Sequence, residues 1–173
     1  MAESIYERFI VRQPTRSQHK ISVSAWATVE NSRTAPPYML MENGEPISGV
    51  NHMVEFLWIW KDTAMGATKE KPPHKHDLEE MFLFLGTNKD DPSDLGADIE
   101  FWMGEGEQAD KLAFNSSSLV HVPPNLPHMP IIYRNVQKPL LLVICALNAG
   151  HMRAKTIDCP ECLVNPSINN AQG

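Results

Sequence analysis

Short apolar segments alternate with turn residues along most of the chain. Residues 20–30 alternate apolar and polar positions, which is typical of a strand with one buried face. Residues 54–62 are dense in aromatic and β-branched side chains and indicate a buried strand. Asn43 and Gly44 form a strong hairpin signal. Similar segments predict further strands at 74–86, 97–105, 111–115, 119–122, 128–134 and 139–148.

The order of these segments predicts an all-β sandwich or barrel, because no long amphipathic helix interrupts them. The 173 residues are 42% hydrophobic, which favours one globular domain over residues 1–173. The first 19 residues are mixed and polar and are expected to form an arm. Residues 149–173 lose the strand pattern and are expected to form an irregular tail.

The charge balance narrows the choice of partners. Fifteen basic and 21 acidic side chains give a formal net charge of −6 with no basic cluster, so neither nucleic acid nor an anionic membrane surface is expected. No apolar run approaches the roughly 20 residues of a membrane span, and the N-terminus lacks the pattern of a signal peptide. Three cysteines do not suggest a disulfide framework, so a cytoplasmic protein is expected.

The segment HKHDLEE places His74, His76 and Glu80 at even spacing. Residues two apart in a strand point to the same face, so these side chains would converge on one side of the predicted strand 74–86. Two imidazoles and a carboxylate form a plausible set of metal ligands.

Two segments resemble the motifs of the cupin superfamily. HKHDLEEMFLFLG, residues 74–86, is similar to its first motif, and PPNLPH, residues 123–128, is similar to its second. The motifs fall within residues 66–132. The resemblance implies a small jelly-roll barrel in which one divalent metal is bound by His74, His76, Glu80 and His128.

The motifs depart from the family pattern at several positions, none of which removes a ligand. Gly66 lies two residues too far upstream, and Gly86 comes one residue early. Asn125 stands where the second motif usually has glycine, but Asn tolerates the left-handed conformation that glycine would supply. Ile132 replaces an asparagine that often follows the last histidine. These departures indicate a divergent branch.

Glu79 competes with Glu80 for the role of ligand, since its spacing to Gly86 fits the motif better. A shift of one residue in a strand turns a side chain to the opposite face. Because Glu80 has the parity of the two histidines, it is the predicted ligand.

Three imidazoles and one carboxylate without a thiolate suit Fe(II), Mn(II), Ni(II), Cu(II) or Zn(II), and Fe(II) is the preferred metal. Four protein ligands on an octahedral ion would leave two adjacent positions open. A substrate or O₂ could bind there, and the ion could also act as a Lewis acid or activate water.

Several other residues are candidates for the same pocket. Phe82 and Phe84 share the predicted face of Glu80 and would line a water-poor pocket. The candidates for a general base are His121 and Tyr133. The remaining pocket aromatics would be Trp58, Trp60 and Trp102, for which an ordinary place in the barrel core is the alternative.

The opposite face of the same strand is also apolar, with Met81, Leu83 and Leu85. Two apolar faces suggest that both are covered, either by a second subunit in a homodimer or by the N-terminal arm. Cys159 and Cys162 form a CPEC segment, but only Cys145 remains as a further thiol, so a non-catalytic loop is favoured over a zinc or redox site.

Three functions are consistent with these residues. The first is a metalloenzyme acting on a small organic molecule, with oxygenase chemistry preferred. The second is redox-neutral isomerase, lyase or hydrolase chemistry at a Lewis-acidic metal. The third is a non-catalytic domain that binds a small ligand. The fold alone does not choose among them.

Overall fold

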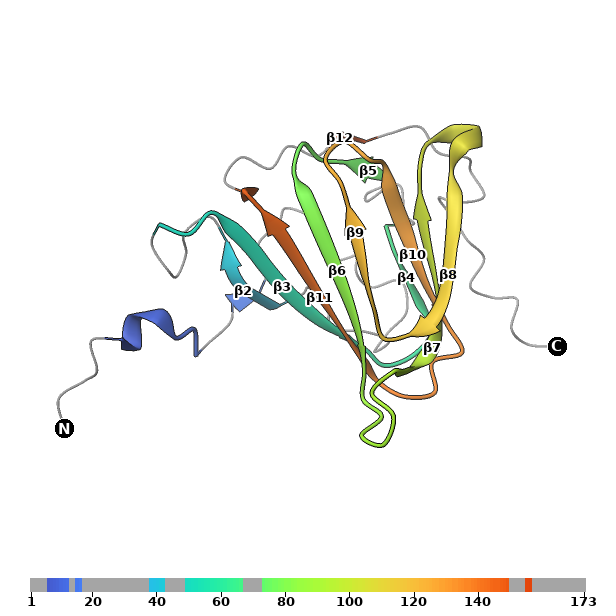
Figure 1. Ribbon diagram of the computed structural model, residues 1–173, viewed down its shortest axis with the longest axis horizontal. Coiled ribbons are helices and arrows are strands. Elements are labelled where there is room, and N and C mark those ends of the chain that lie inside the picture. The colour runs from blue at the N-terminus through green and yellow to red at the C-terminus, as the bar shows by residue number, and fades with distance from the viewer. Residues whose placement is uncertain are drawn as a thin grey trace.

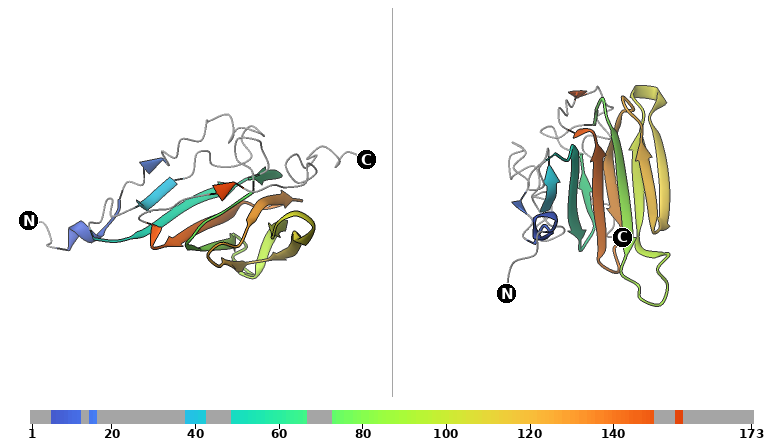
Figure 2. Two further views of the ribbon diagram at one scale, coloured as in Figure 1. Left: turned by 90° about the horizontal axis from the view of Figure 1, so that it is seen from above. Right: turned by 60° about the vertical axis from the view of Figure 1, so that its left-hand side comes forward.

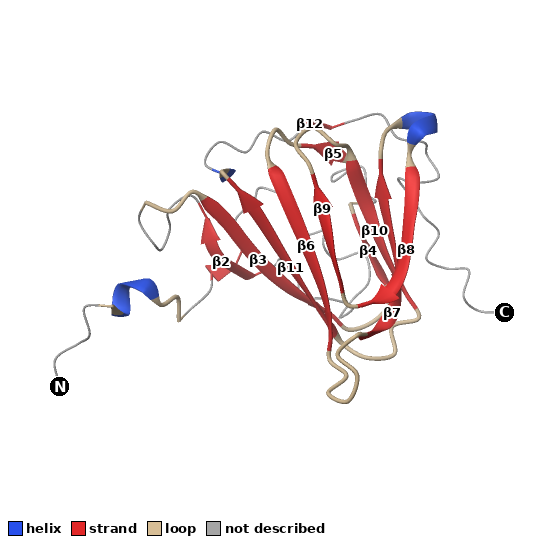
Figure 3. Cartoon of the chain, in the orientation of Figure 1, coloured by secondary structure: helices blue, strands red, loops and turns tan. Residues whose placement is uncertain are grey.

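The computed structural model describes residues 6–12, 15–16, 38–42, 49–66, 73–149 and 155–156, and for the short segments 15–16, 38–42 and 155–156 it describes the backbone alone. Strands make up most of this part of the chain (Figure 3). Two 3₁₀ turns, η1 (Glu7–Phe9) and η2 (Gly106–Gln108), are the helical elements within the described residues. None of the described helices is long and apolar enough to cross a bilayer.

The strands form two sheets that face each other (Figures 1 and 2). In spatial order the first sheet contains β1 (Thr15–Arg16), β2 (Tyr38–Glu42), β3 (His52–Ile59), β11 (Leu140–Leu147), β6 (Glu79–Gly86) and β9 (Ser118–Val122). The second contains β12 (Lys155–Thr156), β5 (His74–Lys75), β10 (His128–Arg134), β7 (Asp94–Met103) and β8 (Asp110–Ser116), and β4 (Thr63–Met65) also pairs with β10. The paired strands are antiparallel in both sheets.

Alternating burial shows which side of each strand faces the core. In β3 every second residue from Met53 is buried, and β11 has the same pattern from Leu140. The inward side chains of both sheets form one core that includes Phe82, Phe84 and Phe101. Each of these three rings is at most 1% exposed. The core therefore occupies the space between the two sheets, as in a jelly roll.

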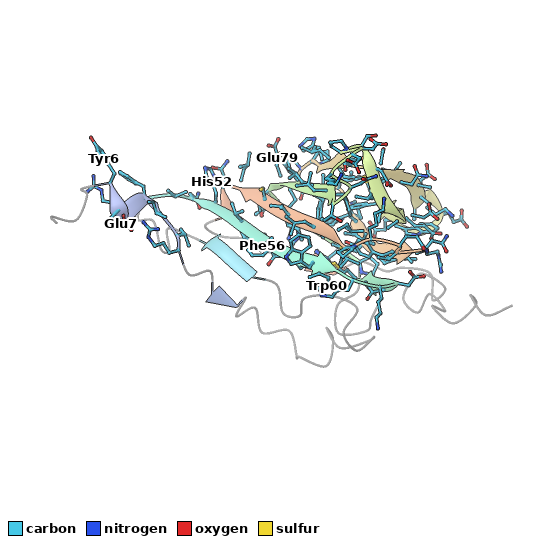
Figure 4. All side chains as sticks on the ribbon, turned by 90° about the horizontal axis from the view of Figure 1, so that it is seen from below. Tyr6, Glu7, His52, Phe56, Trp60 and Glu79 are labelled. Carbon is cyan, nitrogen blue, oxygen red and sulfur yellow. The ribbon has the colours of Figure 1, made fainter. Side chains whose placement is uncertain are left out.

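The all-β class, the jelly roll and most of the predicted strands are confirmed. Segment η1 lies apart from the two sheets (Figure 1), and Tyr6 and Glu7 project from it (Figure 4). The predicted strand at 20–30 and the hairpin at Asn43 and Gly44 lie outside the described residues, as do Cys159 and Cys162.

Two details of the prediction are wrong. Strand β4 lies between the predicted strands at 54–62 and 74–86, where no strand was predicted. The expected continuous strand at 74–86 is broken, because residues 76–78 separate β5 in the second sheet from β6 in the first. The HKHDLEE segment therefore crosses from one sheet to the other, and its ligand candidates do not share one strand.

Candidate metal centre

The crossing between the two sheets brings the candidate ligands together. His74 lies on β5, His76 follows directly in the crossing segment, and Glu80 lies near the start of β6. His128 is the first residue of β10 and pairs in register with His74. The four residues thus come from both sheets and meet at the end of the barrel where β5 and β6 join (Figure 1).

The three imidazoles form a compact group that could hold a metal ion. One ring nitrogen from each of His74, His76 and His128 lies within 4.8 Å of the others. The ring of His74 is centred 4.7 Å from that of His76 and 4.7 Å from that of His128. His76 and His128 are buried, whereas His74 is half-buried. Three ring nitrogens this close together could serve as ligands of one ion.

Glu80 lies beside these rings and Glu79 does not. The Oε2 atom of Glu80 is 3.0 Å from His128 Nε2 and 3.4 Å from His76 Nε2. Glu80 is 5% exposed, whereas the side chain of Glu79 is 49% exposed and projects from the start of β6 (Figure 4). The alternation of β6 therefore turns Glu80 toward the imidazoles and Glu79 toward solvent.

The electrostatics of the group favour an ionised Glu80. Burial alone would raise the pKa of this carboxyl. The close approach of His128, together with electrostatic attraction to His128, His76 and His74, lowers the pKa below its ordinary value overall. A carboxylate is therefore available as a ligand.

A backbone carbonyl fixes the tautomer of His128. Its Nδ1 atom lies 3.2 Å from the carbonyl oxygen of Leu126, which can only accept a hydrogen bond. Nδ1 therefore carries the proton and donates it, and in the neutral ring Nε2 has a lone pair directed toward Glu80.

Two backbone positions that deviate from the family motifs support the same region. Asn125 has a φ of 64°, so it does adopt the left-handed conformation expected of it. Gly66 follows β4 with a φ of 69°, and a Cβ there would lie 2.6 Å from the Cβ of Met129. Since Met129 follows His128, Gly66 leaves the space that the start of β10 occupies.

A cluster of aromatic rings in edge-to-face contact fills the barrel beneath the group. The ring of Phe82 is centred 5.9 Å from that of His128 and 5.1 Å from that of Phe101. Phe84 continues this cluster, with its ring centred 6.2 Å from that of Phe101 and 5.2 Å from that of Phe114. Phe82 therefore lies against the site as expected, and Phe84 lies one layer deeper in the core.

The structure places the other candidate residues away from the imidazoles. Tyr133 is buried in the core, and its hydroxyl donates to the Met65 sulfur at 3.6 Å. His121 is on the outer face, 3.9 Å from Glu79 and 49% exposed. Neither residue is brought into the metal group.

The three tryptophans lie on outer faces as well. Trp58 alternates with the fully buried Leu57 and stacks on Trp60, which is 43% exposed, with 5.5 Å between ring centroids. Trp60 extends from the end of β3 (Figure 4). Trp102 pairs with the exposed Lys111, whereas its neighbour Phe101 points inward. The inner-face aromatics beside the site are phenylalanines.

Two features of this region were not anticipated from the sequence. A cleft of about 380 Å³ opens at the same end of the barrel and is lined by Asp77, Leu78, Glu79, Pro124, Leu147 and Asn148. Glu55 is 7% exposed on the inward side of β3. Its position in the apolar run VEFLWIW, two residues from Leu57, was the available signal for an inward carboxyl group.

Comparisons with known proteins support the fold. No family model matches the chain, and no curated protein sequence is significantly similar to it. Among solved structures, vicilin from Corylus avellana (hazelnut) superposes with a TM-score of 0.51, at 15% identity over 73% of this chain and 32% of the vicilin chain. The DMSP lyase DddQ from Ruegeria pomeroyi DSS-3 superposes with a TM-score of 0.52, at 15% identity over 83% of this chain and 60% of the lyase chain.

The chain has the cupin jelly-roll fold. These identities show the fold alone, and the chain spans 32% of the vicilin and 60% of the lyase. A vicilin and a lyase share this cupin architecture, so the function of the present chain has to be argued from its own site.

Proposed function

We propose that this cupin is a mononuclear metal-dependent enzyme that acts on a small organic molecule, with oxygenase chemistry at Fe(II) preferred. The proposed ligands are His74, His76, Glu80 and His128. One observation supports a metal most strongly: two buried acceptor atoms from opposite sheets face each other at this site.

The donor set fits a cation. The Nδ1–H of His128 donates a hydrogen bond to the carbonyl oxygen of Leu126. In the neutral ring the lone pair of Nε2 then faces the Oε2 atom of Glu80, 3.0 Å away. The contact does not have hydrogen-bond geometry, and neither atom has another hydrogen-bond partner within the described residues. While the His128 ring is neutral, these two atoms are both acceptors and repel each other in a buried site, and a shared positive ion would relieve the repulsion, as protonation of the ring also does.

The types of ligand limit the choice of ion. Three imidazoles and a carboxylate are suited to Fe(II), Mn(II), Ni(II), Cu(II) and Zn(II), and among the described residues no cysteine lies in the group. Such an ion would supply Lewis-acid polarisation of a substrate oxygen or, in the case of Fe(II), reactivity with O₂.

The protein side chains would exclude water and direct the approach of the substrate. Phe82 and Phe101 fill the barrel directly beneath the imidazoles, and both are at most 1% exposed. His74 is the more exposed of the three histidines, and the cleft lined by Leu78 and Pro124 opens at the same end. A substrate would therefore approach the site from this end, on the side of His74, while the phenylalanines keep water out of the barrel beneath.

Redox-neutral isomerase, lyase or hydrolase chemistry is the alternative. It needs an acid–base group near the ion, and neither His121 nor Tyr133 is placed in the group. The third candidate, a non-catalytic domain that binds a small ligand, uses the same pocket without a chemical step.

Metal analysis followed by oxygen consumption would separate the three. The chain would be purified without air, its metal identified, and candidate small molecules screened for O₂ uptake in the parent chain and in His74→Ala. Bound iron with O₂ uptake that His74→Ala abolishes is the expected result. Turnover at the same rate without O₂ would favour the redox-neutral alternative, and metal-loaded protein that binds molecules without converting them would favour the binding domain.

The remaining expectations also stand as proposals. We propose that residues 1–173 form a single domain that works as a homodimer in the cytoplasm. Apolar side chains on the outer face of the first sheet support association, since Leu85 is 40% exposed and Leu119 is 56% exposed. A monomer at micromolar concentration by light scattering would contradict the dimer.

A further inference from the structure

The turn between β9 and β10 contacts both halves of the proposed metal centre through consecutive residues. Asn125 donates its backbone N–H to the carbonyl oxygen of His76 at 2.6 Å. The carbonyl of the next residue, Leu126, accepts from Nδ1 of His128 at 3.2 Å. His76 belongs to the first motif and His128 to the second, so this turn joins two segments that lie far apart in the sequence.

The conformation of Asn125 decides where these two groups point. Its φ of 64° lies in the left-handed region, and the turn closes with the N–H of Leu126 donating to the carbonyl of Pro123 at 3.2 Å. An ordinary residue would favour negative φ, which would rotate the peptide on each side of position 125. The N–H that reaches His76 and the Leu126 carbonyl that holds His128 would then move together.

We infer that Asn125 is a positioning residue for the metal centre, acting through the backbone of the turn. This inference rests on the proposed metal function. The Asn125 side chain is exposed, so the backbone angle rather than the amide group is the property that matters. Glycine adopts positive φ freely, whereas alanine does so at a cost, and the two substitutions therefore separate the angle from the side chain.

The chain offers a matched control for loss of a left-handed asparagine. Asn135 has a φ of 50° and follows β10 at its other end, where its N–H donates to Asp62 Oδ2 at 3.1 Å. Replacement of Asn135 by alanine should disturb a turn of the same kind without affecting His76 or His128.

The test would compare Co(II) binding to metal-free parent chain, Asn125→Ala, Asn125→Gly and Asn135→Ala by calorimetric titration, with thermal unfolding of each metal-free protein. Groups that orient metal ligands typically contribute about 10–100-fold in affinity, and a loss of this size is expected for Asn125→Ala. Asn125→Gly should bind like the parent chain. Asn135→Ala should unfold at a lower temperature while its Co(II) affinity is unchanged.

Two results would overturn the inference while leaving the metal site in place: Asn125→Ala binding Co(II) as tightly as the parent, or Asn135→Ala losing as much affinity as Asn125→Ala. Failure of the parent chain itself to bind Co(II) would overturn the proposed metal function. If Asn125→Ala does not fold, ¹⁵N NMR of the parent chain and Asn125→Gly still tests the mechanism. His128 should carry its proton on Nδ1 in both, and an Nε2-protonated ring would contradict the role assigned to the turn.

Discussion

The Nε2 atom of His128 lies 3.0 Å from the Oε2 atom of Glu80, although the two residues belong to different sheets. His128 begins β10 in the second sheet, and Glu80 lies on β6 in the first. The two acceptors become neighbours only when the sheets pack face to face. Binding of a metal between them should therefore be coupled to the stability of the whole barrel.

This coupling predicts that a divalent metal raises the temperature of unfolding. At a free concentration of about 100 times Kd, a ligand specific for the folded state adds about 2.7 kcal/mol. For a chain of this size such a gain corresponds to a rise of roughly 5–10 °C. Thermal unfolding of metal-free protein with and without Ni(II) would measure it, and a chelator should reverse it.

His128→Ala should abolish this rise, because it removes a proposed ligand. His121→Ala is the matched control, since His121 is 49% exposed on the outer face. The variant at position 121 should keep the rise found in the parent chain. An equal loss in both variants would mean that the metal binds to scattered surface histidines.

The two adjacent glutamates provide a second test of the site. Glu80→Gln keeps the size of the side chain but removes its charge, so metal affinity should fall at least about 10-fold, the lower range of effects at metal centres. Glu79→Gln should bind metal like the parent chain, because Glu79 faces solvent. Calorimetric titration of both metal-free variants would give the comparison. A loss of affinity confined to Glu79→Gln would show that Glu79, and not Glu80, is the ligand.

The sequence predicted the parity of Glu80 correctly but not the path of the chain around it. Alternation in EEMFLFLG is local, so it identifies which residues of β6 share a face. HKHDLEE is equally compatible with one continuous strand, and its break at residues 76–78 depends on pairing of β5 with β10, which is a long-range contact. Local spacing therefore identified the ligand candidates without showing that they come from two sheets.

The tryptophans show a second limit of local patterns. Residues 54–60 are apolar at nearly every position, so the sequence does not show which set of side chains faces the core. The structure turns Glu55 and Leu57 inward and Trp58 outward. A carboxyl group inside and an indole outside reverse the usual preference of each residue. Only the packing of the first sheet against the second fixes that choice.

The aromatic cluster beneath the site should contribute strongly to stability. Phe84 is fully buried and contacts Phe101 and Phe114, so Phe84→Ala would leave a large cavity. The expected loss in the free energy of unfolding is about 3–5 kcal/mol. Leu112→Ala, at a position on β8 that is 42% exposed, should change it by no more than about 0.5 kcal/mol. Urea unfolding would measure both, and a small effect at Phe84 would contradict the tight packing of this layer.

Acid should lower the stability of the folded chain partly by protonating Asp94, which lies far from the metal group. Its carboxylate accepts hydrogen bonds from Lys138 Nζ at 2.8 Å, Asn88 Nδ2 at 2.9 Å and the Gly96 N–H at 2.9 Å. In that order, these contacts lower the pKa of Asp94 from its usual 3.8 to about 2. A lowered pKa means that the ionised group stabilises the folded chain above pH 3.8, and that this contribution is lost as the pH falls toward 2.

Asp94→Asn should therefore flatten the pH dependence of stability in this range. Its urea midpoint should lie below that of the parent chain at neutral pH, and the two midpoints should converge as the pH falls, because protonation removes the same charge from the parent. Asp90→Asn is the control, since the Asp90 side chain is 76% exposed, and it should follow the parent curve. If the urea midpoints of Asp94→Asn and the parent chain instead follow parallel curves against pH, the charge of Asp94 does not contribute to stability through its contacts with Lys138, Asn88 and Gly96.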